Sequence, residues 1–194
     1  MDTKPHSNIA GLAKDAKLHE KTQQWMNHVL KFNYTYGFTW LGRPIIQQPQ
    51  DIMAIQEIIW KVTPDLIIET GIAHGGSIIF YASMLELIGN QGEVVGIDID
   101  IRQHNKEEIT KHRMYKRIKM IEGSSVNSQT VEQVFQIAED KKRIMVILDS
   151  SHTHDHVLQE LNLYSPLVTK GSYLIVLDTR VEDMPEEIFK NSSW

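Results

Sequence analysis

Acidic residues and small polar residues follow several strongly apolar stretches of this sequence. Glu69 comes directly after "DLII" and precedes the small residues of "TGIAHGGS". Asp98 ends "EVVGID", while Asp149 and Asp178 end "RIMVILD" and "SYLIVLD". Carboxylates can bind ammonium groups, hydroxyls or hard divalent cations, and glycines let a ligand approach the backbone closely. The pattern therefore indicates a binding site for a small polar molecule.

The turn at residues 69–77 does not match the common nucleotide-binding motifs. It reads "ETGIAHGGS", which lacks the G-x-G-x-x-G spacing of dinucleotide-binding turns, and no Gly-Lys-Ser/Thr of a P-loop follows. A carboxylate at this position would repel a diphosphate, but it suits the ammonium group of S-adenosylmethionine. We therefore predict that Glu69 faces the aminoacyl part of this cofactor, and that the next helix offers its free N–H groups to the carboxylate.

The rest of the cofactor is expected to extend along the same edge. Asp98 is placed to accept hydrogen bonds from the ribose hydroxyls, with Asp100 as a weaker candidate, and Ser124 is expected beside the adenine. Taken singly, each residue also fits a structural role, with Glu69 capping the helix and the glycines only forming a turn. Their order along the chain favours cofactor binding. The predicted cofactor-binding residues are Glu69, Gly71, Gly75, Gly76, Ser77, Asp98 and Ser124.

Asp149 and Asp178 are expected on neighbouring strands. Two carboxylates that lie close together in a pocket repel each other unless a proton or a divalent cation lies between them, and all-oxygen ligation suits Mg²⁺. We predict that Asp149 and Asp178 bind Mg²⁺, and that Asp149 and His152 are catalytic, with His152 as general base. The alternative is a purely structural role, in which the two acids cap loops and His152 packs within the protein. The run "HTHDH" at residues 152–156 is one residue short of the metallo-β-lactamase pattern H-x-H-x-D-H, which excludes that metal site.

These residues need a sheet whose strands end at a common edge. From residue 50 onward, strand and helix patterns alternate. The strands "DLIIE", "RIMVIL" and "SYLIVL" are apolar throughout, as parallel strands covered on both faces require. The pattern predicts a doubly wound, mostly parallel α/β sheet of the Rossmann-like type, in which ligands bind at the carboxyl ends of the strands. Strands are expected at 65–69, 93–98, 118–121, 143–148 and 172–177, and helices at 50–62, 75–88, 103–114, 128–140 and 154–164.

The N-terminal part of the chain has a different character. Residues 9–31 have helical spacing, and residues 32–49 are aromatic and interrupted by glycine and proline. The aromatic segment either covers a pocket as a lid or is a packed loop, and its residues 32–40 are a candidate wall for an acceptor substrate. We divide the chain into a helix and aromatic cover segment at 1–49 and a cofactor-binding α/β domain at 50–194.

Composition excludes several classes of function. The 194 residues include no cysteine, so disulfides and thiolate metal sites are excluded. The net charge of −5 argues against a nucleic-acid partner, and no apolar run reaches transmembrane length. Because the start "MDTKPHSN" lacks the pattern of a secretory signal, we expect a cytoplasmic protein. The basic run at 111–119 is either a solvated surface or a site of attraction for an acidic substrate.

Several motifs, in order, resemble the family of rhamnosyl O-methyltransferases and the protein named cephalosporin hydroxylase. The resemblance lies in "DLIIETGIAHGGS", "VVGIDIDIR", "ILDSSHTHDHVLQEL" and "GSYLIVLDT", preceded by "YGFTWLGRPIIQQPQD", and it extends over residues 33–194. It implies a class I methyltransferase fold, S-adenosylmethionine as cofactor, and methylation of a hydroxyl on a sugar, glycolipid or specialised metabolite, as in lipid or polysaccharide biosynthesis. It also implies that the acids after the fourth and fifth strands, here Asp149 and Asp178, bind Mg²⁺.

The sequence departs from that family pattern in two ways. Some members carry a Glu-Asp pair where this chain has Leu177-Asp178. The methyltransferase sheet usually has two more strands, so we expect either a truncated chain or a homo-oligomer in which a partner completes the sheet edge. Two other functions stay open: a nicotinamide-dependent oxidoreductase on a similar sheet, and a binding module that has lost catalysis.

Overall fold

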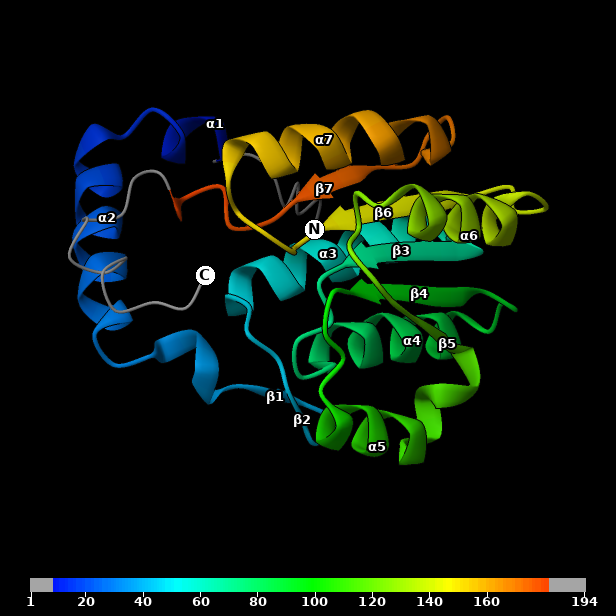
Figure 1. Ribbon diagram of the computed structural model, residues 1–194. Coiled ribbons are helices and arrows are strands. Elements are labelled where there is room, and N and C mark those ends of the chain that lie inside the picture. Colours follow the sequence, from blue (N-terminus) through cyan, green and yellow to red (C-terminus); the bar gives the residue numbers. More distant parts are fainter. Residues whose placement is uncertain (1–8, 182–194) are drawn as a thin grey trace.

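A parallel sheet of five strands lies at the centre of residues 9–181, the part of the chain that the computed structural model describes (Figure 1). The strands are β3 (Leu66–Thr70), β4 (Glu93–Asp98), β5 (Ile118–Glu122), β6 (Ile144–Leu148) and β7 (Leu174–Val176). Their order across the sheet is β5-β4-β3-β6-β7, and all pairs are parallel. Because the chain proceeds from β3 first to one side and later to the other, the strand order reverses beside β3, where such sheets bind ligands. The predicted α/β fold is confirmed.

Helices cover both faces of this sheet. They are α3 (Pro49–Val62), α4 (Gly76–Ile88), α5 (Gln103–Lys111), α6 (Ser128–Ala138) and α7 (His154–Tyr164). Figure 1 shows α4 and α5 on one face and α6 and α7 on the other. Alternate residues of β3 enter different core clusters, with Ile67 packing beside Ile59 and Phe80 and with Ile68 packing beside Val134. All residues of β3 and β6 are buried, which explains their continuous apolar sequences.

The N-terminal region differs in part from its prediction. The helix expected at 9–31 is divided into α1 (Ile9–Leu12) and α2 (Ala16–Leu30), so the prediction of one continuous helix was wrong. Asp15 is the cause, because its carboxylate accepts a hydrogen bond from the Leu18 N–H at 3.0 Å and begins a new helix there. Helix α2 lies apart from the sheet, opposite the carboxyl ends of the strands (Figure 1).

The aromatic segment connects α2 to the sheet. It contains the 3-10 helix η1 (Tyr34–Gly37) and a hairpin formed by β1 (Thr39–Trp40) and β2 (Arg43–Pro44). The centre of the Tyr34 ring lies 5.5 Å from that of Trp25 in α2 and 5.0 Å from that of Phe38. A row of aromatic rings therefore joins α2 to this segment. Trp40 packs against the core and donates a hydrogen bond to the Ser83 hydroxyl at 3.0 Å.

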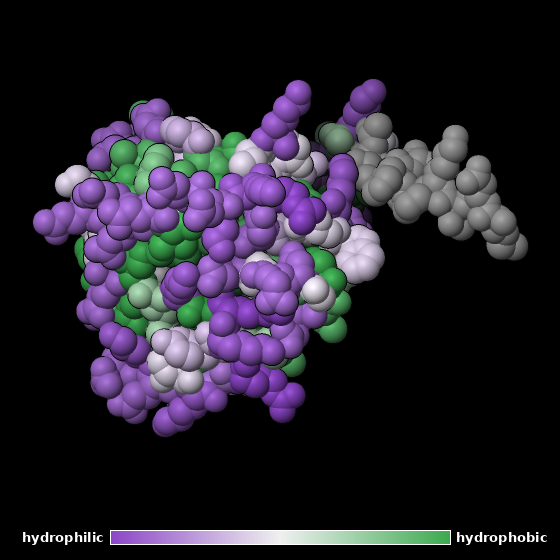
Figure 2. Space-filling view, turned by 90° about the vertical axis from the view of Figure 1, so that its right-hand side faces the viewer, coloured by the Kyte–Doolittle hydropathy of each residue, from purple (hydrophilic) through white to green (hydrophobic). Residues whose placement is uncertain are grey.

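The opposite end of the sheet carries ion pairs between the protein's own side chains. Glu86 pairs with Lys116 and Arg117, each at 2.6 Å, and Glu93 pairs with Lys119 at 3.1 Å and with Lys141 at 2.9 Å. Figure 2 shows that the surface at this end is mostly hydrophilic. The basic run at 111–119, which includes the 3-10 helix η2 (Arg113–Arg117), is thus partly neutralised by these carboxylates.

Residues 1–8 of the predicted cover segment and residues 182–194 of the predicted α/β domain lie outside the described residues. Helix α3 begins at Pro49, next to the predicted boundary, but the division into a cover segment and an α/β domain stays a prediction. Strand β7 pairs with β6 on one side and lies at the edge of the sheet within the described residues. Between residues 9 and 181, no helix has the length and apolar composition needed to span a membrane.

Candidate active site

The turn between β3 and α4 is organised around a buried carboxyl group. Glu69 has no exposed surface, and it accepts hydrogen bonds from the Ser77 hydroxyl at 2.6 Å and the Tyr81 hydroxyl at 2.9 Å. Burial raises the pKa of Glu69 to about 8, despite the two hydrogen bonds that act in the opposite direction. The Glu69 carboxyl therefore carries a proton at neutral pH, and it donates this proton to one of the two hydroxyls. It holds β3 to α4, and its predicted contact with a cofactor ammonium group stays a prediction.

The glycines of this turn are required by close backbone contacts. Gly71 has a φ of +93°, and a Cβ atom there would lie 2.0 Å from the carbonyl oxygen of Asp149. A Cβ atom on Gly76 would lie 2.2 Å from the carbonyl oxygen of Pro44. Gly75 has a φ of +83° and precedes α4, whose first turn has no side-chain cap. The backbone N–H groups at the start of α4 are thus not used by a capping side chain.

Asp98 lies at the end of β4 and contacts the same turn. Its Oδ2 atom accepts hydrogen bonds from the N–H groups of Ile72 at 2.8 Å and Ala73 at 3.0 Å, while its Oδ1 atom accepts one from Asp100 at 3.1 Å. Ser124 follows the neighbouring strand β5 and is half-buried. The structure therefore brings Asp98 against the turn and places Ser124 at the same edge of the sheet. Their contacts with ribose and adenine stay predictions.

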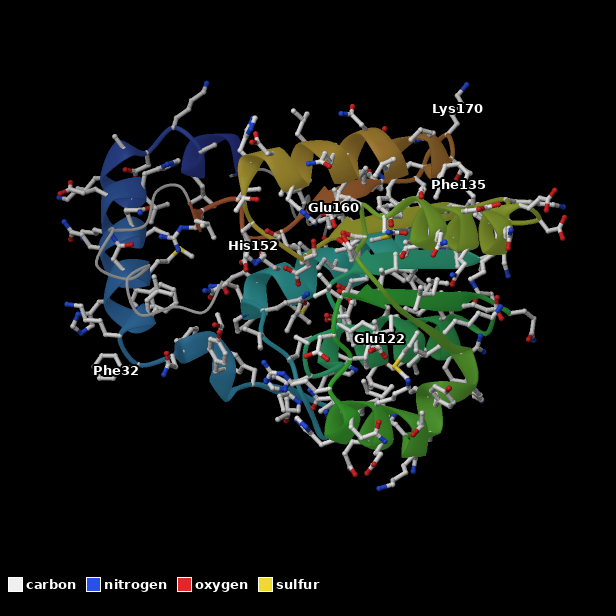
Figure 3. The ribbon with its side chains drawn as sticks, viewed as in Figure 1. Phe32, Glu122, Phe135, His152, Glu160 and Lys170 are labelled. Atoms are coloured by element: carbon white, nitrogen blue, oxygen red, sulfur yellow. The ribbon has the colours of Figure 1, made fainter. Side chains whose placement is uncertain are left out.

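Asp149, His152 and Asp178 converge beyond the ends of β6 and β7. Each offers one ligand atom, and these three atoms lie within 4.8 Å of one another. The His152 Nε2 atom is 3.3 Å from the Asp178 Oδ2 atom. In Figure 3, His152 lies on the side of the sheet that faces α2. The three residues that the sequence marked for metal binding and catalysis are thus brought together, although their roles are untested.

The charges around this cluster favour a cation. Burial, then the neighbouring carboxyl groups of Glu69 and Asp178, hold the pKa of Asp149 well above its ordinary value. Partial burial and the charge of Asp178 also raise the pKa of Asp51, in the first turn of α3. A divalent ion would relieve this repulsion, and the two carboxylates offer the oxygen ligands that Mg²⁺ prefers, with the imidazole of His152 beside them. The side chain of Leu177 is a hydrocarbon that packs against the core, and it offers no oxygen ligand.

A cavity of about 700 Å³ opens beside this cluster. Asp149 and Asp178 form one part of its wall, and α2 contributes Trp25 and Met26. Of the aromatic residues expected to form a wall at 32–40, Tyr36 lines the cavity, whereas Phe38 and Trp40 pack against the core. The second part of the aromatic segment is thus a packed loop, whereas its first part borders the cavity, and its role as a lid stays a prediction.

Sequence reasoning missed Gln47, which lines this cavity and is only 6% exposed. Its Nε2 atom is 3.4 Å from the Tyr81 hydroxyl, and its side chain also hydrogen-bonds the Asp149 carboxyl. Gln47 therefore connects the Glu69 network to the Asp149 cluster. A polar pair inside "PIIQQPQ" was the available signal, because buried glutamines are uncommon unless they have partners.

Residues 32–194 match the family described as Rhamnosyl O-methyltransferase/CmcI. The chain belongs to this family. The rhamnosyl O-methyltransferase of Mycobacterium leprae (strain TN) is 30% identical over 167 residues, which cover 86% of this chain and 69% of that protein. The rhamnosyl O-methyltransferase of Mycobacterium tuberculosis (strain ATCC 25618 / H37Rv) is 30% identical over 148 residues, which cover 76% of this chain and 59% of that protein.

Solved structures of more distant relatives share the fold. The structure of CmcI-D160 with Mg and S-adenosylmethionine has a TM-score of 0.57 and 19% identity, with 80% of this chain and 64% of that chain covered. MycE in complex with Mg, S-adenosylhomocysteine and mycinamycin VI has a TM-score of 0.50 and 21% identity, covering 78% of this chain and 36% of that chain. The Rhamnosyl O-methyltransferase/CmcI family thus has an S-adenosylmethionine-dependent methyltransferase fold, and the predicted resemblance is confirmed.

Proposed function

We propose that this protein is an S-adenosylmethionine-dependent O-methyltransferase that methylates a hydroxyl group bound in the cavity beside Asp149. The observation that carries the proposal is the convergence of Asp149, His152 and Asp178, of which Asp149 and Asp178 line a cavity of about 700 Å³. The Gly71 backbone lies directly against Asp149, so the turn expected to bind the cofactor adjoins this cluster. Family membership supports the same reaction.

The β3–α4 turn and its neighbours would hold S-adenosylmethionine, which supplies a methyl group on a positively charged sulfur. The N–H groups at the start of α4 suit its carboxylate, because helix N-termini favour negative charge. Asp98 and Ser124 extend the site toward the ribose and adenine. The turn lacks the G-x-G-x-x-G spacing of dinucleotide-binding turns, which argues against a nicotinamide cofactor.

Asp149 and Asp178 would hold Mg²⁺, which lowers the pKa of a hydroxyl that it binds. His152 is positioned beside them to take the proton from the acceptor hydroxyl. As that proton leaves, the hydroxyl oxygen forms a bond to the methyl carbon, and the bond between that carbon and sulfur breaks. The protein's main contribution is to align the oxygen with the methyl group, and alignment can account for much of the rate enhancement.

The acceptor is inferred from the cavity and from the relatives. Trp25 and Tyr36 provide aromatic surface, and the rest of the wall combines aliphatic side chains with polar and charged ones. Such a mixture suits a sugar or a glycosylated metabolite, because its rings and hydroxyls need both kinds of contact. The names of the curated relatives, rhamnosyl O-methyltransferases, support a hydroxyl on a sugar.

Calorimetric titration with S-adenosylhomocysteine and with NAD⁺, each with and without MgCl₂, tests the cofactor. We expect binding of S-adenosylhomocysteine and no binding of NAD⁺; the reverse result would overturn the proposal. Transfer of a radiolabelled methyl group to a panel of rhamnosides, other glycosides and catechols then tests the reaction. Binding of S-adenosylhomocysteine without transfer to any acceptor would instead support a non-catalytic binding module.

A further inference from the structure

The turn between β3 and α4 has an unfavourable backbone conformation at Ala73. Its φ of +45° lies in the left-handed region that residues with a side chain rarely adopt, and Gly71 and Gly75 in the same turn also have positive φ values. A left-handed alanine persists only where the surrounding structure leaves it no alternative, and such residues gather at ligand sites. Ala73 therefore needs contacts that hold it in this conformation.

Arg43 of the β1–β2 hairpin binds the residue that follows Ala73. Its Nε and Nη2 atoms donate hydrogen bonds to the carbonyl oxygen of His74 at 3.1 Å and 2.6 Å. The guanidinium is half-buried, and none of the ion pairs within residues 9–181 includes it. Because hydrogen bonds from a charged donor are stronger than neutral ones, this contact fixes the direction of the His74 carbonyl.

Asn105, in the first turn of α5, holds the carbonyl of Ala73 itself. Asn105 is only 3% exposed, and its Oδ1 atom accepts a hydrogen bond from the Arg43 Nη2 atom at 2.9 Å. Since a guanidinium can only donate, Arg43 determines which end of the Asn105 amide carries the oxygen. The Nδ2 atom is thereby directed to the Ala73 carbonyl oxygen, to which it donates a hydrogen bond at 3.0 Å. Two consecutive carbonyls of the turn are thus held by the hairpin and α5, which lie side by side in Figure 1.

Asp98 holds the N–H groups of the same turn. The N–H groups of Ile72 and Ala73 both donate to its Oδ2 atom, at 2.8 Å and 3.0 Å. Ala73 is therefore bonded through its N–H group to β4 and through its carbonyl to α5. Its left-handed conformation is fixed from both sides by residues outside the turn.

We propose that Arg43 and Asn105 are positioning residues that hold the β3–α4 turn in its cofactor-binding conformation before S-adenosylmethionine binds. This proposal rests on the proposed methyltransferase function. The hairpin that carries Arg43 is itself packed against the start of α4, since a Cβ atom on Gly76 would lie 2.2 Å from the carbonyl oxygen of Pro44. The hairpin thus serves the cofactor, whereas Tyr36, earlier in the aromatic segment, borders the cavity for the acceptor.

The energetic effect of this positioning falls on the affinity for the cofactor. Without Arg43, Ala73 can relax to an ordinary backbone conformation in the free protein, and the cofactor must restore the left-handed one when it binds. The apparent affinity falls in proportion to the fraction of molecules that are competent to bind. The usual preference of alanine against the left-handed conformation corresponds to a factor of roughly 5–30.

The substitution Arg43→Met tests this proposal, with Arg113→Met at an exposed position of η2 as the matched control. The affinity for S-adenosylhomocysteine, measured by calorimetry, should fall about tenfold in Arg43→Met and stay at the wild-type value in the control. The KM for S-adenosylmethionine should rise by a similar factor, while kcat at saturating cofactor changes by less than about twofold. The affinity for Mg²⁺ without cofactor should be unchanged.

The substitution Ala73→Gly distinguishes positioning from a direct role of the Arg43 charge. Glycine adopts the left-handed conformation about as readily as the right-handed one, so the turn no longer needs to be held. Combined with Arg43→Met, Ala73→Gly should restore most of the lost affinity, whereas alone it should change the affinity little. Arg43→Lys keeps the charge but lacks the planar fork of donors, so it should also lose affinity and be rescued by Ala73→Gly. It provides the same comparison if Arg43→Met does not fold.

Unchanged affinity in folded Arg43→Met would overturn the proposal. So would a loss of affinity that Arg43→Lys avoids and Ala73→Gly does not repair, because Arg43 would then act on the cofactor through its charge. Hydrogen exchange of the Ile72 and Ala73 N–H groups, measured by NMR without cofactor, should be faster in Arg43→Met than in wild type and in Arg113→Met. Equal exchange rates would refute the positioning role whatever the affinities. Absence of S-adenosylhomocysteine binding by the wild-type protein would instead refute the proposed methyltransferase function.

Discussion

Replacing Glu69 with glutamine should make the protein more stable, and increasingly so as the pH rises. The folded protein holds a proton on Glu69 up to a pH of about 8, whereas the unfolded chain releases it near the ordinary pKa of 4.5. Between these values the folded state binds more protons than the unfolded state, so the free energy of unfolding decreases with rising pH. A glutamine at this position cannot ionise. It still offers a carbonyl oxygen to Tyr81, and the Ser77 hydroxyl can rotate to meet its amide.

The size of the effect follows from the difference in pKa. Each pH unit between the two pKa values changes the free energy of unfolding by about 1.4 kcal/mol. pH 7 lies about 2.5 units above the unfolded-state pKa. At this pH, the ionisation of Glu69 in the unfolded chain should have lowered the free energy of unfolding of the wild-type protein by about 3 kcal/mol. From pH 5 to pH 8, the stability of Glu69→Gln relative to wild type should increase by about 4 kcal/mol.

Urea unfolding followed by tryptophan fluorescence at pH 5, 6, 7 and 8 measures this difference directly. Other titrating groups affect both proteins and cancel in the comparison. Glu132→Gln, at an exposed position on α6, is the matched control and should follow wild type at every pH. A difference between Glu69→Gln and wild type that stays constant from pH 5 to pH 8 would show that Glu69 is ionised in the folded protein, and the assigned proton would be wrong.

Three further substitutions probe the site. Asp178→Asn should weaken Mg²⁺ binding, measured by calorimetry without cofactor, by tenfold or more, since even residues that only support metal ligands cost about 10–100-fold; equal affinity would remove Asp178 from the metal site. His152→Gln should lower kcat by roughly 10²–10⁴-fold with little change in the affinity for S-adenosylhomocysteine, and a normal rate would exclude it as the base. Gly71→Ala should destabilise the protein by more than about 2 kcal/mol in urea unfolding, because it adds a Cβ atom against Asp149 in a left-handed backbone conformation; wild-type stability would contradict that contact.

The elements that build the sheet could be predicted because their sequences leave little choice. "DLIIE" and "RIMVIL" are apolar at every position, and the strands found at Leu66–Thr70 and Ile144–Leu148 differ from the predicted ranges by one residue at most ends. The division of the first helix was missed because Asp15 has the sequence character of an exposed helical residue. Its capping bond to Leu18 exists only once the chain has turned at that position.

The details of the site depend on contacts between distant parts of the chain. The sequence placed Glu69 at the end of a strand, but its proton depends on complete burial beneath α4 and on the position of Tyr81. The role of Gln47 depends on Tyr81, which lies 34 residues later. The convergence of Asp149 and Asp178 was predictable, because neighbouring parallel strands end together. The exposed fraction and the hydrogen-bond partners of each side chain could not be predicted from the sequence.

Helix α2 has a further consequence for how this protein can diversify. None of its residues is buried, yet Trp25, Met26 and Leu30 form part of the cavity wall. Changes along α2 can therefore reshape the space offered to an acceptor at little thermodynamic cost, because the interior between the sheet and its covering helices is untouched. Helix α2 lies outside residues 32–194, which match the family, so under the proposed function it can alter acceptor recognition without any change in the matched residues. It is also the natural target for libraries that seek new acceptors.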